Sequence, residues 1–239
     1  MASKPDRKRL SREEIVQAAL EIAEEQGIRN VSMRKVARHL DAGTMSLYHY
    51  VRTKDDLLAL MDDAIMGEIV IPEGEMPDDW RGRVTLIAKM SLAAWMKRPW
   101  LIDEQDEEFR ITENALRHMD QTIGALDDLD VSASLKFEIM SQVDDYVFGF
   151  AVRERKVGHI KDTDPERFEE ATDFVEARVR DGGYPSLERM FVSDRSFEEQ
   201  WLEMFDEIYD ESRFDRGLDR LLDGVEAELK RLGALPVGS

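Results

Sequence analysis

The chain has 239 residues, of which 42% are hydrophobic and 36% are charged, and its formal net charge is −19. This composition suits a packed globular protein, with one large domain or two modest ones, better than a disordered chain. No run of 18 apolar residues and no secretory signal is present, so we expect no membrane association. The absence of cysteine excludes disulfides, thiolate metal sites and cysteine nucleophiles, which fits a cytoplasmic protein.

The charge is unevenly distributed along the chain. Residues 1–56 carry 11 Lys or Arg and 9 Asp or Glu, whereas the remaining residues carry 22 and 43. A strongly acidic body would repel nucleic acid, so only the N-terminal part could approach it. The acidic residues could also serve only to keep the body solvated, and charge alone does not decide between these interpretations.

Helical patterns begin near the N-terminus. Ser11 followed by Glu14 forms a capping box, and Gly27 is suited to end the first helix. A second helix begins after Ser32, a short third one falls in "MSLYHYV", and a longer helix starts at Lys54. Two short helices joined by a tight turn beside a longer first helix make a helix-turn-helix, whose second short helix enters the DNA major groove. An ordinary three-helix corner has the same spacing.

The side chains of the two short helices favour DNA binding over an ordinary corner. The first helix crowds basic side chains, at Arg34, Lys35 and Arg38. The next offers hydroxyl groups and rings able to hydrogen-bond, at Thr44, Ser46, Tyr48, His49 and Tyr50. Three neighbouring rings cannot all enter one core, because successive helical residues point about 100° apart. We expect the tyrosines to present hydroxyl groups to phosphates, although one of the two could be buried.

The segment "VSMRKVARHLDAGTMSLYHYVRTKDDLLALM" resembles the DNA-binding domain of the TetR family of bacterial transcription regulators. Similarity to the family's tetracycline-repressor-like C-terminal domain appears at Arg98–Leu101 and Phe214–Leu229. The resemblance implies an all-α fold, with a three-helix helix-turn-helix domain followed by a larger helical ligand-binding and dimerisation domain. It also implies DNA contacts for eight residues: Arg34, Thr44, Met45, Ser46, Tyr48, His49, Tyr50 and Lys54. The family commonly has glycine where this chain has Asp41, but aspartate also tolerates left-handed geometry.

Two prolines and a glycine at residues 71–79 mark the best domain boundary. We therefore expect a DNA-binding domain at 1–56 with a basic N-terminal arm, a connecting helix and linker at 57–79, and a ligand-binding and dimerisation domain at 80–239.

Two late helices, at about 134–155 and 203–231, are expected to associate with those of a second subunit. The resemblance implies that these helices pack as a four-helix dimer bundle. An apolar stripe on the last helix would supply the seam, through Leu218, Leu222, Val225 and Leu229. The same stripe could instead close the domain's own core.

The apolar helix at 134–152 carries a carboxylate, Asp144, on the face that it shares with Phe137 and Met140. A carboxylate on such a face is costly to bury unpaired, so Asp144 either pairs with an arginine or anchors a ligand. We expect a small apolar or aromatic effector, which could carry a positive charge, in the body of each subunit. The flexible and aromatic residues expected around it are Trp95, Met119, Phe137 and Met140.

Catalysis finds little support in the sequence. The four histidines show no metal-ligand spacing, and no phosphate-binding glycine loop or hydrolase motif is present, so we expect no enzyme, metal or cofactor. The sequence instead predicts a cytoplasmic, homodimeric repressor that binds a palindromic double-stranded DNA operator and is released by a small molecule. A constitutive DNA-binding protein and a helical metal-dependent enzyme are the alternatives.

Overall fold

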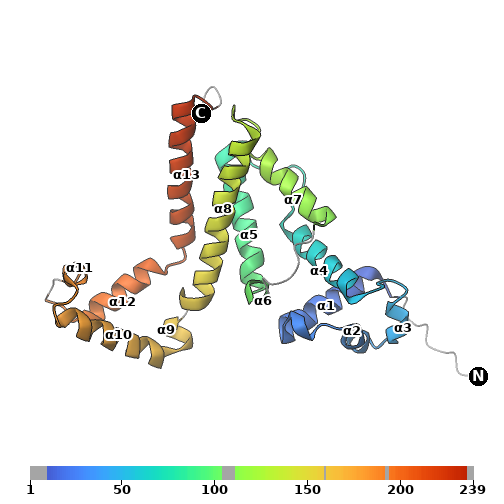
Figure 1. Ribbon diagram of the computed structural model, residues 1–239, viewed down its shortest axis with the longest axis horizontal. Helices are drawn as coiled ribbons and strands as arrows, with labels where there is room; N and C mark the ends of the chain where they lie inside the picture. Colours follow the sequence, from blue (N-terminus) through green and yellow to red (C-terminus); the bar gives the residue numbers. More distant parts are fainter. Residues whose placement is uncertain (1–9, 104–110, 159, 192–193, 236–239) are drawn as a thin grey trace, which may run out of the picture. The chain divides into compact units, whose positions relative to one another are not determined.

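The structure is a computed structural model of the chain, and it describes residues 10–103, 111–158, 160–191 and 194–235. Every regular element in these ranges is a helix, so the predicted all-α fold is confirmed (Figure 1). None of the described helices is long and apolar enough to cross a bilayer. The predicted basic arm, residues 1–9, lies outside the described residues.

The chain divides into two compact units, residues 1–141 with 234–239, and residues 142–233. The helices of the first unit are α1 (Arg12–Gln26), a short 3-10 turn (Ile28–Asn30), α2 (Met33–His39), α3 (Thr44–Leu47), α4 (Lys54–Ile69), α5 (Trp80–Lys97), α6 (Trp100–Asp103), α7 (Glu113–Gly124) and the first part of α8 (Ala133–Arg153). Those of the second are the rest of α8, a π-helical turn (Glu154–Gly158), α9 (Ile160–Thr163), α10 (Pro165–Arg180), α11 (Pro185–Glu188), α12 (Phe197–Ile208) and α13 (Arg213–Leu232). The predicted functional limits at 1–56, 57–79 and 80–239 stay a prediction.

Local sequence signals set the ends of the N-terminal helices. The Ser11 hydroxyl accepts from the Glu14 N–H and the Glu14 carboxylate accepts from the Ser11 N–H, both at 3.1 Å, which confirms the predicted capping box. Thr53 and Asp56 form a second capping box at the start of α4. Gly27 ends α1 with a φ of 83°, a conformation that side chains disfavour.

A single apolar core holds α1 to α4 together. Each helix contributes a side chain with no exposed surface: Ile15, Val36, Leu47 and Leu57. Because α3 is only four residues long, its position depends on Leu47 and on the buried Val51 that follows it. The core therefore determines where the outer side of α3 points.

The turn between α2 and α3 depends on Asp41. Its φ is 49°, and no other non-glycine residue in the described ranges has a positive φ. The Asp41 N–H donates to the Arg38 carbonyl at 3.2 Å, and the Ala42 N–H donates to the Ala37 carbonyl at 2.8 Å. The expectation that aspartate would adopt left-handed geometry here is confirmed.

A buried arginine joins α1, α4 and the end of α5. Arg98 is 2% exposed, and it donates to both carboxylate oxygens of Glu68, at 2.9 and 2.6 Å. Its Nε lies 3.3 Å from a carboxylate oxygen of Glu24 on α1. Hydrogen bonds from Arg98, and then from Lys97, lower the pKa of Glu68 to about 2. This bidentate pair fixes the three helices in one geometry.

One face of α7 binds the second half of α4 and the segment that follows it through polar side chains. The Asn114 N–H donates to the Asp63 carboxylate at 2.8 Å, and Gln121 exchanges two hydrogen bonds with the backbone of Ile71, at 2.9 and 2.6 Å. His118 lies between them in sequence and hydrogen-bonds the backbone at the end of α4. The three side chains follow at steps of four and three, so they share one helix face.

In the second unit, α13 packs on the end of α8 through aromatic rings. The Phe214 ring lies 5.4 Å from that of Tyr146 and 5.1 Å from that of Phe150. The Tyr146 hydroxyl donates to the Phe214 carbonyl at 2.8 Å. Glycine is needed at position 217, because a Cβ there would overlap the Tyr146 hydroxyl group, which is held by its hydrogen bond to Phe214.

The helix predicted at 203–231 is two helices, and this part of the prediction is wrong. The Tyr209 N–H ends α12 by donating to the Phe205 carbonyl, and α13 begins only at Arg213. The Arg213 guanidinium lies over the rings of Phe150 and Tyr209, at 4.6 and 4.7 Å, and donates to Glu154 at 2.9 Å. These contacts stabilise the break between α12 and α13, which the apolar periodicity of the sequence does not reveal.

We predict that Asp41→Val lowers the free energy of unfolding by about 1–2 kcal/mol, because a β-branched residue tolerates the left-handed region poorly. Asp41→Gly, the matched control, should leave stability within a few tenths of a kcal/mol of the wild type or raise it slightly, because glycine adopts a positive φ without a steric penalty. Urea unfolding measured by circular dichroism gives both values. Equal stability of the valine variant and the wild type would show that the turn rearranges.

Candidate functional site

The side of α3 that faces away from the core is polar and open. Leu47 is buried, and Met45, two residues earlier, points away from it because two helical steps turn a side chain by about 200°. Met45 is 75% exposed. Thr44 and Ser46 are half-buried beside it, and His49 is exposed in the turn that follows. The structure thus exposes Met45 and His49 on this short helix and its turn, with Thr44 and Ser46 partly covered beside them.

The three consecutive rings that follow Leu47 have different environments. Tyr50 is half-buried and packs against the core of the domain, and its carbonyl accepts from the Arg12 guanidinium at 3.3 Å. Tyr48 and His49 are exposed. All three lie in a turn, because α3 is shorter than predicted and ends at Leu47. One tyrosine is therefore a packing residue, while the hydroxyl group of Tyr48 is able to reach a phosphate.

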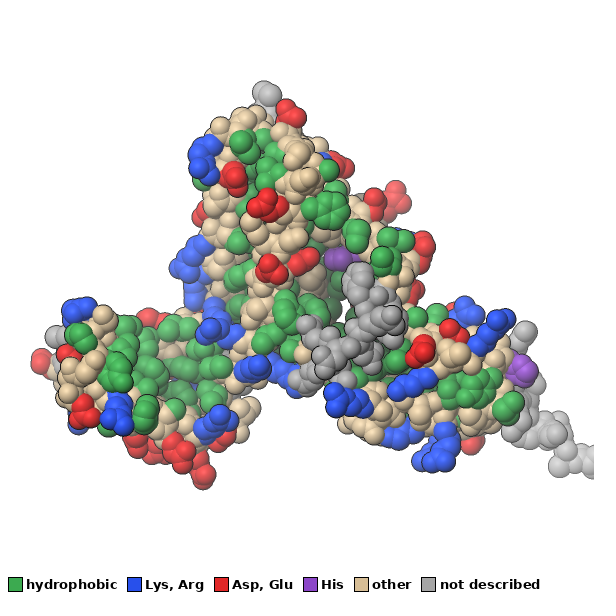
Figure 2. Space-filling model, in the orientation of Figure 1, with side chains coloured by type: hydrophobic (Ala, Val, Ile, Leu, Met, Phe, Trp, Pro, Cys, Tyr) green, Lys and Arg blue, Asp and Glu red, His purple; other side chains and the backbone are tan. Residues whose placement is uncertain are grey.

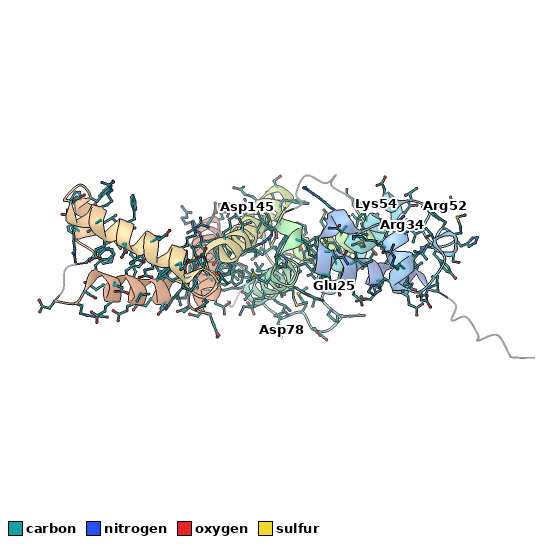
Figure 3. The ribbon with its side chains drawn as sticks, turned by 90° about the horizontal axis from the view of Figure 1, so that it is seen from below. Glu25, Arg34, Arg52, Lys54, Asp78 and Asp145 are labelled. Carbon is teal, nitrogen blue, oxygen red and sulfur yellow. The ribbon has the colours of Figure 1, made fainter. Side chains whose placement is uncertain are left out.

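Exposed cations flank α3. Arg34 on α2, Arg52 in the loop and Lys54 at the start of α4 form no ion pair with another described residue. The positive end of the helix dipole disfavours a cation at the first residue of α4, so the helix gains no stability from Lys54. Figure 3 labels these three residues on the α2–α4 part of the domain, and Lys and Arg side chains gather over this lobe in Figure 2. Unpaired cations at these positions are suited to bind phosphate.

Arg52 is not among the residues predicted from the sequence. The signal for it was present, because Arg52 lies two residues before Lys54 in "VRTK" and both side chains are charged. Its exposure in the loop between α3 and α4 adds a third cation beside the predicted pair.

Two family models match the chain. Residues 15–61 match the model described as "Bacterial regulatory proteins, tetR family", and residues 72–229 match "Tetracyclin repressor-like, C-terminal domain". The chain belongs to the TetR family. Regulators of this family are DNA-binding proteins rather than enzymes, and they bind operators as dimers and respond to small-molecule effectors. The resemblance predicted from both parts of the sequence is confirmed.

Curated relatives of this TetR-family chain are also regulators. The HTH-type transcriptional repressor DrrR1 of Streptomyces coeruleorubidus is 28% identical over 224 residues, which is 91% of this chain and 77% of the relative. An HTH-type transcriptional regulator of Saccharopolyspora erythraea is 29% identical over 218 residues, 91% of this chain and 85% of the relative. The crystal structure of ActR from Streptomyces coelicolor in complex with actinorhodin has a TM-score of 0.61 at 22% identity, and the alignment covers 92% of this chain and 98% of ActR. This last similarity supports the fold.

The residues predicted around an effector do not share one environment. Met140 is buried, Trp95 is half-buried, and Met119 and Phe137 are exposed. These four residues lie in the first compact unit and Asp144 lies in the second. The combined effector site therefore stays a prediction.

Asp144 forms no ion pair or hydrogen bond with another described residue, so the structure does not support the alternative in which it pairs with an arginine. Part of its side chain is exposed to solvent. Desolvation, and to a smaller extent repulsion from Asp145, raises the pKa of the Asp144 carboxyl to about 6. A carboxylate in this state is stabilised by a cationic or hydrogen-bond-donating partner.

Three buried side-chain nitrogens of the first unit have no hydrogen-bond partner among the described residues: Arg98 Nε, which lies beside the Glu24 carboxylate, His118 Nδ1 and Trp100 Nε1. Desolvation lowers the pKa of His118, which favours the neutral ring, while its other contact is the backbone of Ile69. Buried polar atoms normally have partners, so His118 Nδ1 and Trp100 Nε1 are candidates for polar contacts with a small molecule. Neither residue was predicted, because an isolated histidine or tryptophan produces no periodic signal.

The predicted dimer seam belongs to the chain's own core, and this assignment is corrected. In the single chain the exposed fraction is between 0 and 6% for all four residues: Leu218, Leu222, Val225 and Leu229. Side chains that are already buried offer no surface to a second chain. The two helices expected to form the bundle, α8 and α13, have open positions elsewhere. Nothing lies within 4 Å of a Cβ added at Gly149 on α8 or at Gly224 on α13. Glycine in a helix interior lowers helix stability by about 1 kcal/mol relative to alanine, so neither glycine stabilises its own helix.

We predict that Asp144→Asn raises the melting temperature at pH 7.5. In the folded state the pKa of Asp144 lies above its ordinary value of 3.8. Ionisation of this carboxyl therefore lowers the stability of the fold as the pH rises past 3.8, and the loss is complete above about pH 6. Solvent screening of this exposed side chain reduces the effect to a rise of about 2–4 °C. The difference should vanish near pH 4, where the wild-type carboxyl is protonated in the folded state. Calorimetry across this pH range checks the prediction, with the exposed Glu138→Gln as the control; a difference that is constant with pH would contradict it.

Proposed function

We propose that the protein is a cytoplasmic repressor that binds a palindromic operator as a homodimer and is released by a small apolar or aromatic effector. The proposal of DNA binding rests on one observation: unpaired cations flank the solvent-exposed outer side of α3. Phosphate contacts position a protein on the duplex, and contacts with base edges supply specificity. The surface of α3 offers groups for both.

The proposed roles follow from the position of each side chain. Arg34, Tyr48 and Lys54 contact phosphates, with Arg52 as an additional cation. Base edges are contacted by the outer residues of α3 and its turn, which are Thr44, Met45, Ser46 and His49. Tyr50 contributes through its hydroxyl group alone, because its ring packs against the core.

The effector is proposed to bind among α5, α6, α7 and the first part of α8. Exposed Met119 and Phe137 supply apolar surface, and the buried unpartnered atoms of His118 and Trp100 supply polar contacts. A chain of this fold holds actinorhodin in the ActR structure, and a TetR variant from Acinetobacter baumannii holds minocycline. These complexes support a small-molecule site of mixed polarity in this chain.

Coupling between effector and operator is proposed to run through α4. Its first residue, Lys54, belongs to the DNA surface, whereas its second half is held by α7 and by Arg98. An effector that changes the position of α7 changes the position of α4, and with it the separation of the two recognition helices in the dimer. The effector must bind the DNA-incompetent arrangement more tightly, and this difference in affinity limits the response.

The function is tested by selecting duplexes from random double-stranded DNA with the full-length protein. The expected product is an inverted repeat whose half-site centres lie about one helical turn apart, roughly 34–36 Å. Actinorhodin and minocycline are then titrated into the complex as first probes of release, followed by a library of aromatic compounds. Selection without any enriched sequence contradicts the operator, and an operator complex that no compound weakens supports the constitutive alternative.

We predict that Lys54→Ala weakens binding to all DNA sequences by a similar factor, because a phosphate contact carries no base information. The slope of log affinity against log salt should become shallower by about one unit for each Lys54 removed. Fluorescence anisotropy at several salt concentrations measures both quantities. Lys161→Ala, which removes a cation on α9 that pairs with Asp206 on α12, serves as the control and should change neither. An unchanged salt slope for Lys54→Ala would remove this residue from the phosphate surface.

We propose that the dimer seam lies on the open sides of α8 and α13, at Gly149 and Gly224. We predict that Gly224→Glu gives a folded monomer with little operator affinity, because the added side chain meets no atom of its own chain but occupies the space of the second one. Leu222→Glu should instead unfold the chain, because it places a charge at a fully buried position. Ultracentrifugation and circular dichroism separate the two outcomes. If Gly224→Glu and Gly149→Glu both remain dimers, the seam lies elsewhere.

A further inference from the structure

Met45 is more exposed than any other large hydrophobic side chain in the described ranges, at 75%. It is the second residue of α3, on the side of that helix opposite the buried Leu47. The apolar core of the domain does not use it, because Leu47 and Val51 already anchor this segment. An apolar side chain at this position thus contributes little to folding.

The surroundings of Met45 are polar and basic. Thr44 and Ser46 are its neighbours on α3, and the unpaired cations Arg34, Arg52 and Lys54 flank the helix. An isolated methionine among such groups is unsuited to an apolar protein interface. The combination of a methionine with surrounding cations is suited to a negatively charged surface that also presents a small apolar group.

The major groove of DNA has this character. Among the base edges that it presents, the C5-methyl group of thymine is the only apolar one, and the other groups are hydrogen-bond donors and acceptors. Methionine offers no donor and only a weak acceptor, so it cannot distinguish bases by conventional hydrogen bonds. Its flexible, polarizable side chain is able to adapt to a methyl group at the floor of the groove.

We propose that Met45 specifies a thymine in each operator half-site through contact with its C5-methyl group. This inference rests on the proposed DNA-binding function and names one base that the recognition helix selects. The hydrogen-bonding residues Ser46 and His49 act on other base positions. The thymine contact contributes specificity without any hydrogen bond.

The test uses the operator obtained by selection, with each thymine replaced in turn by deoxyuridine. This replacement removes only the methyl group and keeps every hydrogen-bonding group of the base. We expect one position per half-site at which the wild-type affinity falls about fourfold, the effect of burying one methyl group, and about fifteenfold when both half-sites are changed. Thymine-to-cytosine replacement at that position should also weaken binding, and 5-methylcytosine should restore part of the affinity.

Matched variants assign the effect to a side chain. Met45→Ala should lose most of the difference between thymine and uracil, whereas Met45→Leu should keep it. Met190→Ala, which truncates an exposed methionine in the turn after α11, should retain the wild-type difference. Thr44→Ser tests the nearest competing methyl group, and it should also retain the difference.

The outcomes separate this inference from the proposed function. An operator that binds specifically but tolerates uracil at every position overturns the role of Met45 and leaves the proposed function intact. The same holds if Met45→Ala keeps the full thymine preference, or if Thr44→Ser abolishes it. Failure to select any operator contradicts the proposed function, and the thymine contact with it.

Discussion

The burial of Leu47 is the contact on which the DNA-binding surface depends. A helix of four residues has little stability of its own, because nucleating a helical turn fixes several residues for a single hydrogen bond. The shape of α3 is therefore imposed by the α1–α4 core, into which Leu47 and Val51 insert. Any change that loosens this core alters the direction of Met45 and its neighbours, even where the changed residue is itself buried.

Pairing distinguishes structural cations from those available for DNA. Arg98 is buried between two carboxylates, and Arg213 is held by Glu154 and two aromatic rings. These two guanidinium groups connect helices. Arg34, Arg52 and Lys54 are exposed and have no ion-pair partner among the described residues. On a chain with net charge −19, such cations concentrate the positive potential on one domain, which orients its approach to DNA.

The helix α4 connects the proposed DNA surface with the part of the first unit where the effector is proposed to bind. Its start is fixed by a capping box at Thr53 beside the DNA surface, and its second half is held by polar contacts from α7 and by the Glu68–Arg98 pair. A single helix transmits a displacement along its length because its backbone hydrogen bonds resist bending. The buried, unpartnered Nδ1 of His118 lies on the α7 side of this connection, where a small molecule would have the most direct effect on α4.

The sequence by itself determined the features that depend on neighbouring residues. The capping box at Ser11, the stop at Gly27 and the left-handed turn at Asp41 are short-range geometries, and each was predicted correctly. The start of α4 at Lys54 followed in the same way. The helix-turn-helix motif is a fixed order of such signals, and for this reason the family and the DNA-contacting candidates could be inferred before the structure was described.

Only the tertiary structure decided which faces are covered. The stripe from Leu218 to Leu229 has the same periodicity whether it packs on its own chain or on a second one, and the structure buries it in the single chain. It likewise placed Tyr50 against the core and Tyr48 in solvent, left Asp144 without an arginine, and broke the last predicted helix at Arg213. The physical reason is common to all four cases: burial and pairing depend on segments far apart in the chain, and local periodicity contains no information about which segment becomes the neighbour.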